Sequence, residues 1–188
     1  MSIGYLALVL HAHLPFVRHP ESDFVLEEEW LFEAITETYV PLLTMFEGLK
    51  RDGIDFKMTM SMTPPLVAML SDPLLQERYD EHLSKLEELL EMEIERNAKN
   101  GHIKYLAEYY AKEFNHVRQV WEHYGGNLIK GFRKFLESGN LDIITCGATH
   151  GYLPLMKMYP EAVWGQIEVA CQSHEDNFGR RPSGIWLP

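Results

Sequence analysis

Two histidines, His11 and His13, directly follow an almost unbroken apolar run over residues 3–10. Near-continuous apolarity is typical of a strand that is covered on both faces, and parallel α/β sheets bind ligands just beyond the carboxyl ends of their strands. Side chains alternate along an extended chain, so both imidazoles should point to the same side. Two imidazoles in phase could hydrogen-bond a ligand or hold a metal ion, whereas the alternative is a pair of loop histidines satisfied by the backbone. The spacing favours a site.

A second polar turn repeats this arrangement. A strand predicted over residues 141–146 runs into a glycine-rich turn with His150 and Tyr152, and another predicted over residues 183–187 carries Trp186. The carboxyl ends of parallel strands form the active-site face of a barrel and the binding edge of a doubly wound sheet. This coincidence favours an enzyme. We expect three histidines to converge in one cleft: His11, His13 and His150.

The elements between these strands follow from hydrophobic periodicity. Acidic residues at 27–29 suit the start of a helix that runs to Gly53, and Pro41 should kink this helix. Alternation over residues 56–62 predicts a second strand, and residues 63–140 then predict two long amphipathic helices that break at Asn100-Gly101, followed by a shorter helix. A last helix begins at Pro160 and ends near Gly179. One face of it should be buried, with a satisfied core histidine among its residues: Trp164, Ile167, Cys171, His174 and Phe178.

The composition excludes several classes of protein. The 188 residues are 46% hydrophobic, enough for one domain with a sizeable core, and the formal net charge of −11 argues against a nucleic-acid groove. No apolar run approaches the length of a membrane helix, and the amino end lacks the basic region of a secretory signal, so we expect a cytoplasmic protein that does not bind membranes. Cys146 and Cys171 have neither the number nor the spacing of a zinc site or a disulfide framework, and both should be small core residues.

Four segments of the chain resemble glycoside hydrolase family 57: HAHLPFVRHPE at 11–21, EEEWLFEAITETYVPLL at 27–43, ATHGYLPL at 148–155 and GIWLP at 184–188. They follow the family's order across the whole chain, and the ATHG form is more typical of the family's 1,4-α-glucan branching enzymes than of its amylases and glucanotransferases. The resemblance implies an α/β fold in which residues 1–188 are the N-terminal part of an incomplete (β/α)7 barrel. It also implies a helical hairpin inserted after the second strand, within about residues 64–140.

The resemblance further implies retaining glycosyl transfer that forms α-1,6 branches in an α-glucan, without a cofactor or a metal. In the family, the WLP block continues into the glutamate nucleophile and an aspartate acid/base follows later. We therefore expect the chain to be truncated after Pro188 and to be inactive by itself. By resemblance, the sugar subsite is lined by His11, His13, His150, Tyr152 and Trp186, with Trp30 as a further candidate.

Three alternatives remain open. A family 57 α-amylase or 4-α-glucanotransferase would share the same segments. A metal-dependent barrel deacetylase would hold a divalent ion with histidines and an aspartate, but no aspartate directly follows the first strand. A non-enzymatic binding module would work through the helical hairpin and would leave the histidines at the strand ends unexplained.

Overall fold

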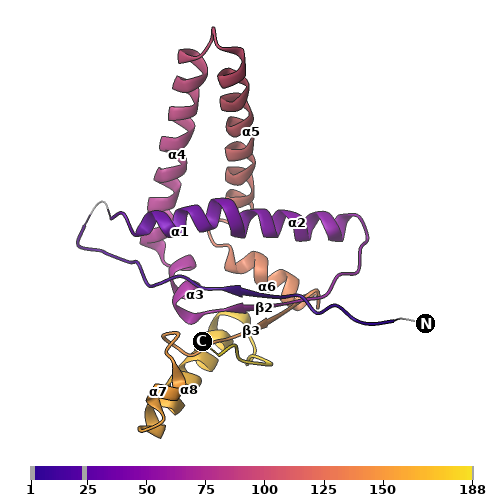
Figure 1. Ribbon diagram of the computed structural model, residues 1–188, viewed down its shortest axis with the longest axis vertical. Helices are drawn as coiled ribbons and strands as arrows, with labels where there is room; N and C mark the ends of the chain where they lie inside the picture. Colours follow the sequence, from indigo (N-terminus) through magenta and orange to yellow (C-terminus); the bar gives the residue numbers. More distant parts are fainter. Residues whose placement is uncertain (1–2, 23–24, 188) are drawn as a thin grey trace.

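The sheet of the computed structural model consists of three parallel strands in the order β1 (Val9–Ala12), β2 (Met58–Met62) and β3 (Leu141–Ile144). The structure describes residues 3–22 and 25–187. Helical segments connect each strand to the next, as parallel pairing requires (Figure 1). The chain therefore has an α/β fold with a small parallel sheet and many helices.

The first strand is shorter and more exposed than its sequence predicts. Residues 3–8 form no regular secondary structure, and the side chains of Ile3, Tyr5 and Leu6 are almost fully exposed. Among the described residues, β1 pairs only with β2, so its other edge and the apolar residues before it have no packing partner there. The prediction of a strand covered on both faces is wrong for this chain, because only the face of β1 that carries Leu10 and Ala12 packs on the core, while Val9 and His11 on the other face are exposed.

The last predicted strand, residues 183–187, is reduced to one parallel bridge between Thr145 and Ile185. Thr145 donates its amide to the carbonyl of Gly184 at 3.2 Å, and its own carbonyl accepts from the amide of Trp186 at 2.8 Å. This bridge brings Trp186 beside the carboxyl end of β3. Pro188, which the sequence places at the end of the predicted strand, lies outside the described residues.

A long helical segment crosses the base of the helical hairpin and connects β1 to β2 (Figure 1). It comprises α1 (Glu28–Ala34), the π-helical turn η1 (Ile35–Tyr39) and α2 (Val40–Arg51). Pro41 has no amide hydrogen, and in a regular α-helix its ring would press against the carbonyl four residues earlier. The sequence predicts a kink at Pro41, and the structure has this wider π-helical turn just before it.

The segment between β2 and β3 is entirely helical. The sequence pattern did not predict α3 (Pro64–Leu70), but it predicted the hairpin of α4 (Pro73–Arg96) and α5 (Gly101–His123), which projects away from the sheet in Figure 1. The Asp72 carboxylate accepts the amides of Leu74 and Leu75 and caps α4, and the Asn100 side chain caps α5. Positive φ angles of 64° and 73° at Gly125 and Gly126 end α5 before α6 (Ile129–Glu137).

The described chain ends with α7 (Leu153–Met156) and α8 (Pro160–Phe178). His174 is a satisfied core residue, as predicted, because its two ring nitrogens lie 2.7 and 2.9 Å from the carbonyl oxygens of Arg180 and Ile143. Trp164 is 66% exposed and Cys171 is only partly buried, so the prediction of a core position is wrong for both. The reason is that the first turns of α8 extend away from the sheet, and only its later turns pack on the core (Figure 1).

Candidate functional site at the ends of the strands

Three imidazole rings stack at the carboxyl edge of the sheet. The ring centroids of His13 and His150 lie 3.9 Å apart, and the ring of His11 lies 5.1 Å from that of His150 and 6.1 Å from that of His13. His11 belongs to β1, His13 directly follows it, and His150 lies in the turn after β3. The predicted convergence of these residues is therefore observed, and we call them the histidine cluster.

Two hydroxyl groups, one on β2 and one directly after it, orient the two histidines at the end of β1. The parallel register places His11 beside Ser61, and the His11 Nδ1 atom lies 2.5 Å from the Ser61 hydroxyl. Two residues further on, His13 Nδ1 lies 3.1 Å from the hydroxyl of Thr63. Ser61 and Thr63 are fully buried. Each hydroxyl engages Nδ1, and no hydrogen bond to the Nε2 atom of either imidazole is found among the described residues, so Nε2 is left to meet a ligand.

His150 is presented by a tight turn that α8 holds in place. Its φ angle of 55° lies in the left-handed region, and its amide donates to the carbonyl of Gly147 at 2.9 Å. The Gln166 side chain accepts the Thr149 amide and donates to the Thr149 hydroxyl, both at 2.9 Å. His150 Nδ1 is buried and has no hydrogen-bond partner among the described residues. The turn thus fixes a ring nitrogen that is available for a partner.

The surroundings of the cluster favour neutral imidazoles. Burial is the main cause that lowers the pKa of His11, His13 and His150 below the ordinary histidine value. Positive charge on His150 would repel His11 and His13, which lowers their pKa values further. A neutral imidazole donates one hydrogen bond and accepts another, so each ring of the cluster can pair with a hydroxyl group in either role.

Of the three predicted aromatic residues, only Trp186 joins the cluster. Its ring centroid lies 5.5 Å from that of His11 at an interplanar angle of 28°, and its side chain is 42% exposed. Tyr152 follows the His150 turn with its ring exposed, and Trp30 lies in the first turn of α1, about half exposed. Within the described residues, no ring contact joins Tyr152 or Trp30 to a histidine. The structure therefore places one aromatic face at the cluster.

An open hollow of about 700 Å³ extends from His13 and His150 along the edge of the sheet. Its walls are mainly apolar and come from the loop after β1, the start of α3 and the side of α8, and they include Phe16, Pro65 and Val169. This volume is within the range of about 300–1,000 Å³ that ligand pockets commonly have. The sequence did not single out these wall residues, because no local pattern links the three segments.

The loop after the cluster is fastened to the base of the hairpin. The Glu28 carboxylate is buried and accepts from Arg78 Nη1 at 2.6 Å, and Arg78 also donates to the carbonyl oxygens of His19 and Ser22. Arg18, in the same loop, pairs with Asp72 at 2.6 Å. These contacts hold the loop that follows His13 against α4, and we call Arg78 and Glu28 the loop clasp.

Several features of the described chain bear on other classes of site. Within residues 3–22 and 25–187, no three His, Cys, Asp or Glu side chains are grouped so that they could hold a metal ion. The charges that act on the histidine cluster are those of its own members. None of the described helices is both long enough and apolar enough to cross a membrane.

Comparison with known proteins identifies the relatives of this chain. The sequence model of Glycosyl hydrolase family 57 matches residues 7–188. A 1,4-alpha-glucan branching enzyme of Thermococcus kodakarensis is 36% identical over 187 residues, which cover 98% of this chain and 27% of that protein.

Two crystal structures are also similar. That of a GH57-type branching enzyme from Pyrococcus horikoshii is 37% identical, with a TM-score of 0.92 over 98% of this chain and 34% of that one. That of an α-amylase from Thermotoga maritima is 49% identical, with a TM-score of 0.92 over 96% of this chain and 34% of that one. The chain therefore spans about a third or less of the length of these relatives. Because the family match extends over nearly every residue, the chain belongs to glycosyl hydrolase family 57.

Proposed function

We propose that the protein to which these residues belong acts on α-1,4-glucans and forms α-1,6 branches in them. The observation that carries this proposal is the convergence of the histidine cluster with Trp186 at the carboxyl ends of parallel strands. Uncharged imidazoles with free Nε2 atoms can bind sugar hydroxyls, and an indole face can pack on the apolar face of a pyranose ring. The relatives named branching enzymes support the choice of reaction.

In the proposed reaction, the cluster orients the glucosyl unit whose bond is broken. A carboxylate attacks the anomeric carbon and the glycosidic bond breaks, while a carboxylic acid gives its proton to the leaving oxygen. The 6-hydroxyl of an acceptor glucan then attacks the covalent intermediate, its proton returns to the acid/base, and the nucleophile is released. We propose that both carboxyl groups lie beyond Pro188, and that residues 1–188 alone do not transfer glucan.

We further propose that the three strands are the first part of an incomplete (β/α)7 barrel in which the α4–α5 hairpin is an insertion within residues 64–140. The order of the strands supports this proposal, since β1, β2 and β3 are adjacent in space in the order in which they occur in the chain. The unpaired edge of β1 and the exposed residues 3–8 would then pack against later parts of the same barrel.

A second candidate function is hydrolysis of α-glucan by an α-amylase. The specific observation that favours it is the 49% identity to the crystal structure of the Thermotoga maritima α-amylase. The two activities share the covalent intermediate and differ only in whether water or a sugar hydroxyl completes the reaction.

The experiment that decides between them uses purified full-length enzyme and amylose. Products are measured twice, as new reducing ends and, after enzymatic debranching, as a chain-length profile. Branching predicts new branch points with few reducing ends, and hydrolysis predicts the reverse. An enzyme that is inactive on every α-glucan would refute both proposals. Branch points formed by residues 1–188 alone would refute the placement of the carboxyl groups beyond Pro188.

The role of the cluster is tested in the same assay with His13→Ala and, as a matched control, His102→Ala. His102 is an exposed histidine in the first turn of α5, far along the chain from the cluster. His13→Ala should lower kcat/KM by about 100-fold or more, because a bound hydroxyl loses its partner in the transition state, and His102→Ala should not change it. Equal activity of both variants would contradict the proposed role.

A further inference from the structure

We propose that the corner between α5 and the η1–α2 helix is a second α-glucan-binding surface. It shares no lining residue with the hollow at His13 and His150, although Glu37 and Met45 also border a hollow next to His11 and His13. We call it the α2–α5 corner and define it by Glu37, Met45, Tyr109, Tyr110 and Glu113. The proposal rests on the proposed function, because it takes the polymer of that reaction as the ligand. It gives the helical hairpin a role in binding, in addition to the binding at the strand ends.

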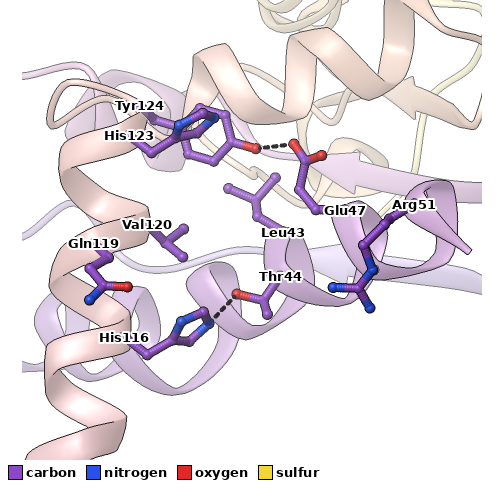
Figure 2. A pocket seen from close by; sticks show the side chains of 10 residues that line it. Leu43, Thr44, Glu47, Arg51, His116, Gln119, Val120, His123 and Tyr124 are labelled. Atoms are coloured by element: carbon purple, nitrogen blue, oxygen red, sulfur yellow. Dashed lines mark hydrogen bonds between the residues drawn. The ribbon is translucent and has the colours of Figure 1, made fainter.

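The corner is a fixed concave surface. The hydroxyl of Thr44 on α2 and the Nε2 atom of His116 on α5 lie 3.1 Å apart and tie the two helices together where they cross (Figure 2). A hollow of about 610 Å³ lies on the Tyr109 side of this contact, and a smaller one of about 370 Å³ lies on the Tyr124 side. Figure 2 shows the smaller hollow, in which Tyr124 donates to Glu47 at 2.7 Å. These bonds hold the corner in shape before any ligand arrives, which lowers the entropy cost of binding.

The wall of the larger hollow presents two exposed aromatic rings. Tyr109 is 47% exposed and Tyr110 is 53% exposed, and their ring centroids lie 5.7 Å apart at an angle of 77°. Both residues belong to α5, which packs against α2. Exposed aromatic rings that are gathered at one concave place are typical of a binding surface rather than of ordinary solvent-exposed helix.

The polar groups of the corner select the kind of ligand. Among the described residues, none forms a hydrogen bond or an ion pair with Glu37, Glu113 or the hydroxyls of Tyr109 and Tyr110. The corner therefore offers carboxylate acceptors and phenolic groups that can donate, next to apolar ring faces. A chain of sugar rings has hydroxyls that both donate and accept and also has apolar faces, so it matches all three features. An anionic partner would meet two carboxylates, and a simple cation would leave the donors unused.

A second binding site on the same enzyme would raise the affinity for polymers and not for short chains. A long glucan that is held at the corner is kept at a high effective concentration near the cluster, whereas a short oligosaccharide cannot occupy both places. The expected signature is therefore a change in KM or retention for amylose that is absent for a short maltooligosaccharide.

The test is electrophoresis of native full-length enzyme through gels with and without amylose, together with kinetics on amylose and on a short maltooligosaccharide. In Tyr109→Ala/Tyr110→Ala, retention by amylose should weaken by about 10-fold, because two stacking faces are lost, and KM for amylose should rise while turnover of the short substrate stays within about twofold. Tyr109→Phe/Tyr110→Phe keeps the faces and should retain most of the binding. The matched control is Tyr105→Ala, since Tyr105 is 62% exposed on the same helix but does not line the hollow.

The outcomes separate this inference from the proposed function. If the double alanine variant is retained by amylose as strongly as the unchanged enzyme, or if Tyr105→Ala weakens retention equally, the corner is not a glucan-binding surface. Neither result bears on the proposed reaction at the strand ends. If the double variant loses turnover of the short substrate as well, the tyrosines act on folding or on the strand-end site and the inference is wrong. An enzyme without activity on any α-glucan would instead refute the proposed function itself.

Discussion

The loop clasp offers the sharpest test of how the hairpin supports the site. We predict that Arg78→Met loosens the loop that follows His13. The substitution keeps a long apolar stem but removes the 2.6 Å pair with Glu28 and the hydrogen bonds to the carbonyl oxygens of His19 and Ser22. It leaves the Glu28 carboxylate, whose side chain is 3% exposed, without its cationic partner.

The magnitude follows from burial. Removing one partner of a buried ion pair costs about 3–5 kcal/mol, mostly because the remaining charge is desolvated and unpaired. Solvent screening reduces this only slightly here, since both side chains are largely inaccessible. Glu28→Gln in the same background removes that charge, so the double variant should be less destabilised than Arg78→Met alone. The exposed pair of Arg96 and Glu93 is the control, and Arg96→Met should cost less than about 0.5 kcal/mol.

The assay is hydrogen–deuterium exchange of full-length enzyme, followed by mass spectrometry of peptides that cover residues 13–22. A decrease of about 3 kcal/mol in the free energy that is needed to open the loop corresponds to roughly 100-fold faster exchange. Exchange in α6 should stay unchanged, because within the described residues no hydrogen bond or ion pair joins the clasp to that helix. The reasoning is refuted if Arg78→Met leaves the loop peptides as protected as before, or if the double variant exchanges faster than the single one.

Three further predictions concern titration, metal and thiol reactivity. Because the pKa values of the histidine cluster are lowered in the folded protein, the unfolded chain binds more protons at acidic pH. The cluster's contribution to stability should therefore be full above about pH 6.5 and fall as the pH drops below it, and glucan binding should weaken in the same range; a melting temperature and a glucan affinity that stay constant from pH 7.5 to 5 would contradict this. Extensive chelation should leave activity unchanged, and loss of activity that a divalent metal restores would favour a metal-dependent mechanism. Burial raises the pKa of Cys146 to about 11, so iodoacetamide should label Cys171 well before Cys146 in native enzyme, as peptide mass spectrometry can show.

Local patterns in the sequence were enough to predict the helical hairpin. The apolar residues of α4 and α5 recur at helical spacing. At the break between them, Asn100 is the N-cap of α5 and Gly101 is its first residue. Such features depend on residues within a few positions of one another, which is the range over which backbone propensities and caps act. Two features escaped prediction because they do not depend on such local patterns alone. The helix α3 is short, and the exposure of Trp164 depends on how far α8 extends beyond the sheet.

For the site, the sequence by itself determined the identity and phase of the histidines. The alternation of an extended chain puts His11 and His13 on one side, and Gly147 and Gly151 leave room beside the His150 turn for the side chains of Gln166 and Met156. The tertiary structure alone decided their partners. The register of β1 on β2 pairs His11 with Ser61 and brings His13 to Thr63, fifty residues away in each case, and the adjacency of β2 and β3 carries His150 onto His13. The physical reason is that strand register is fixed by packing and hydrogen bonding between segments that are distant in the chain, and no pattern within either segment encodes it.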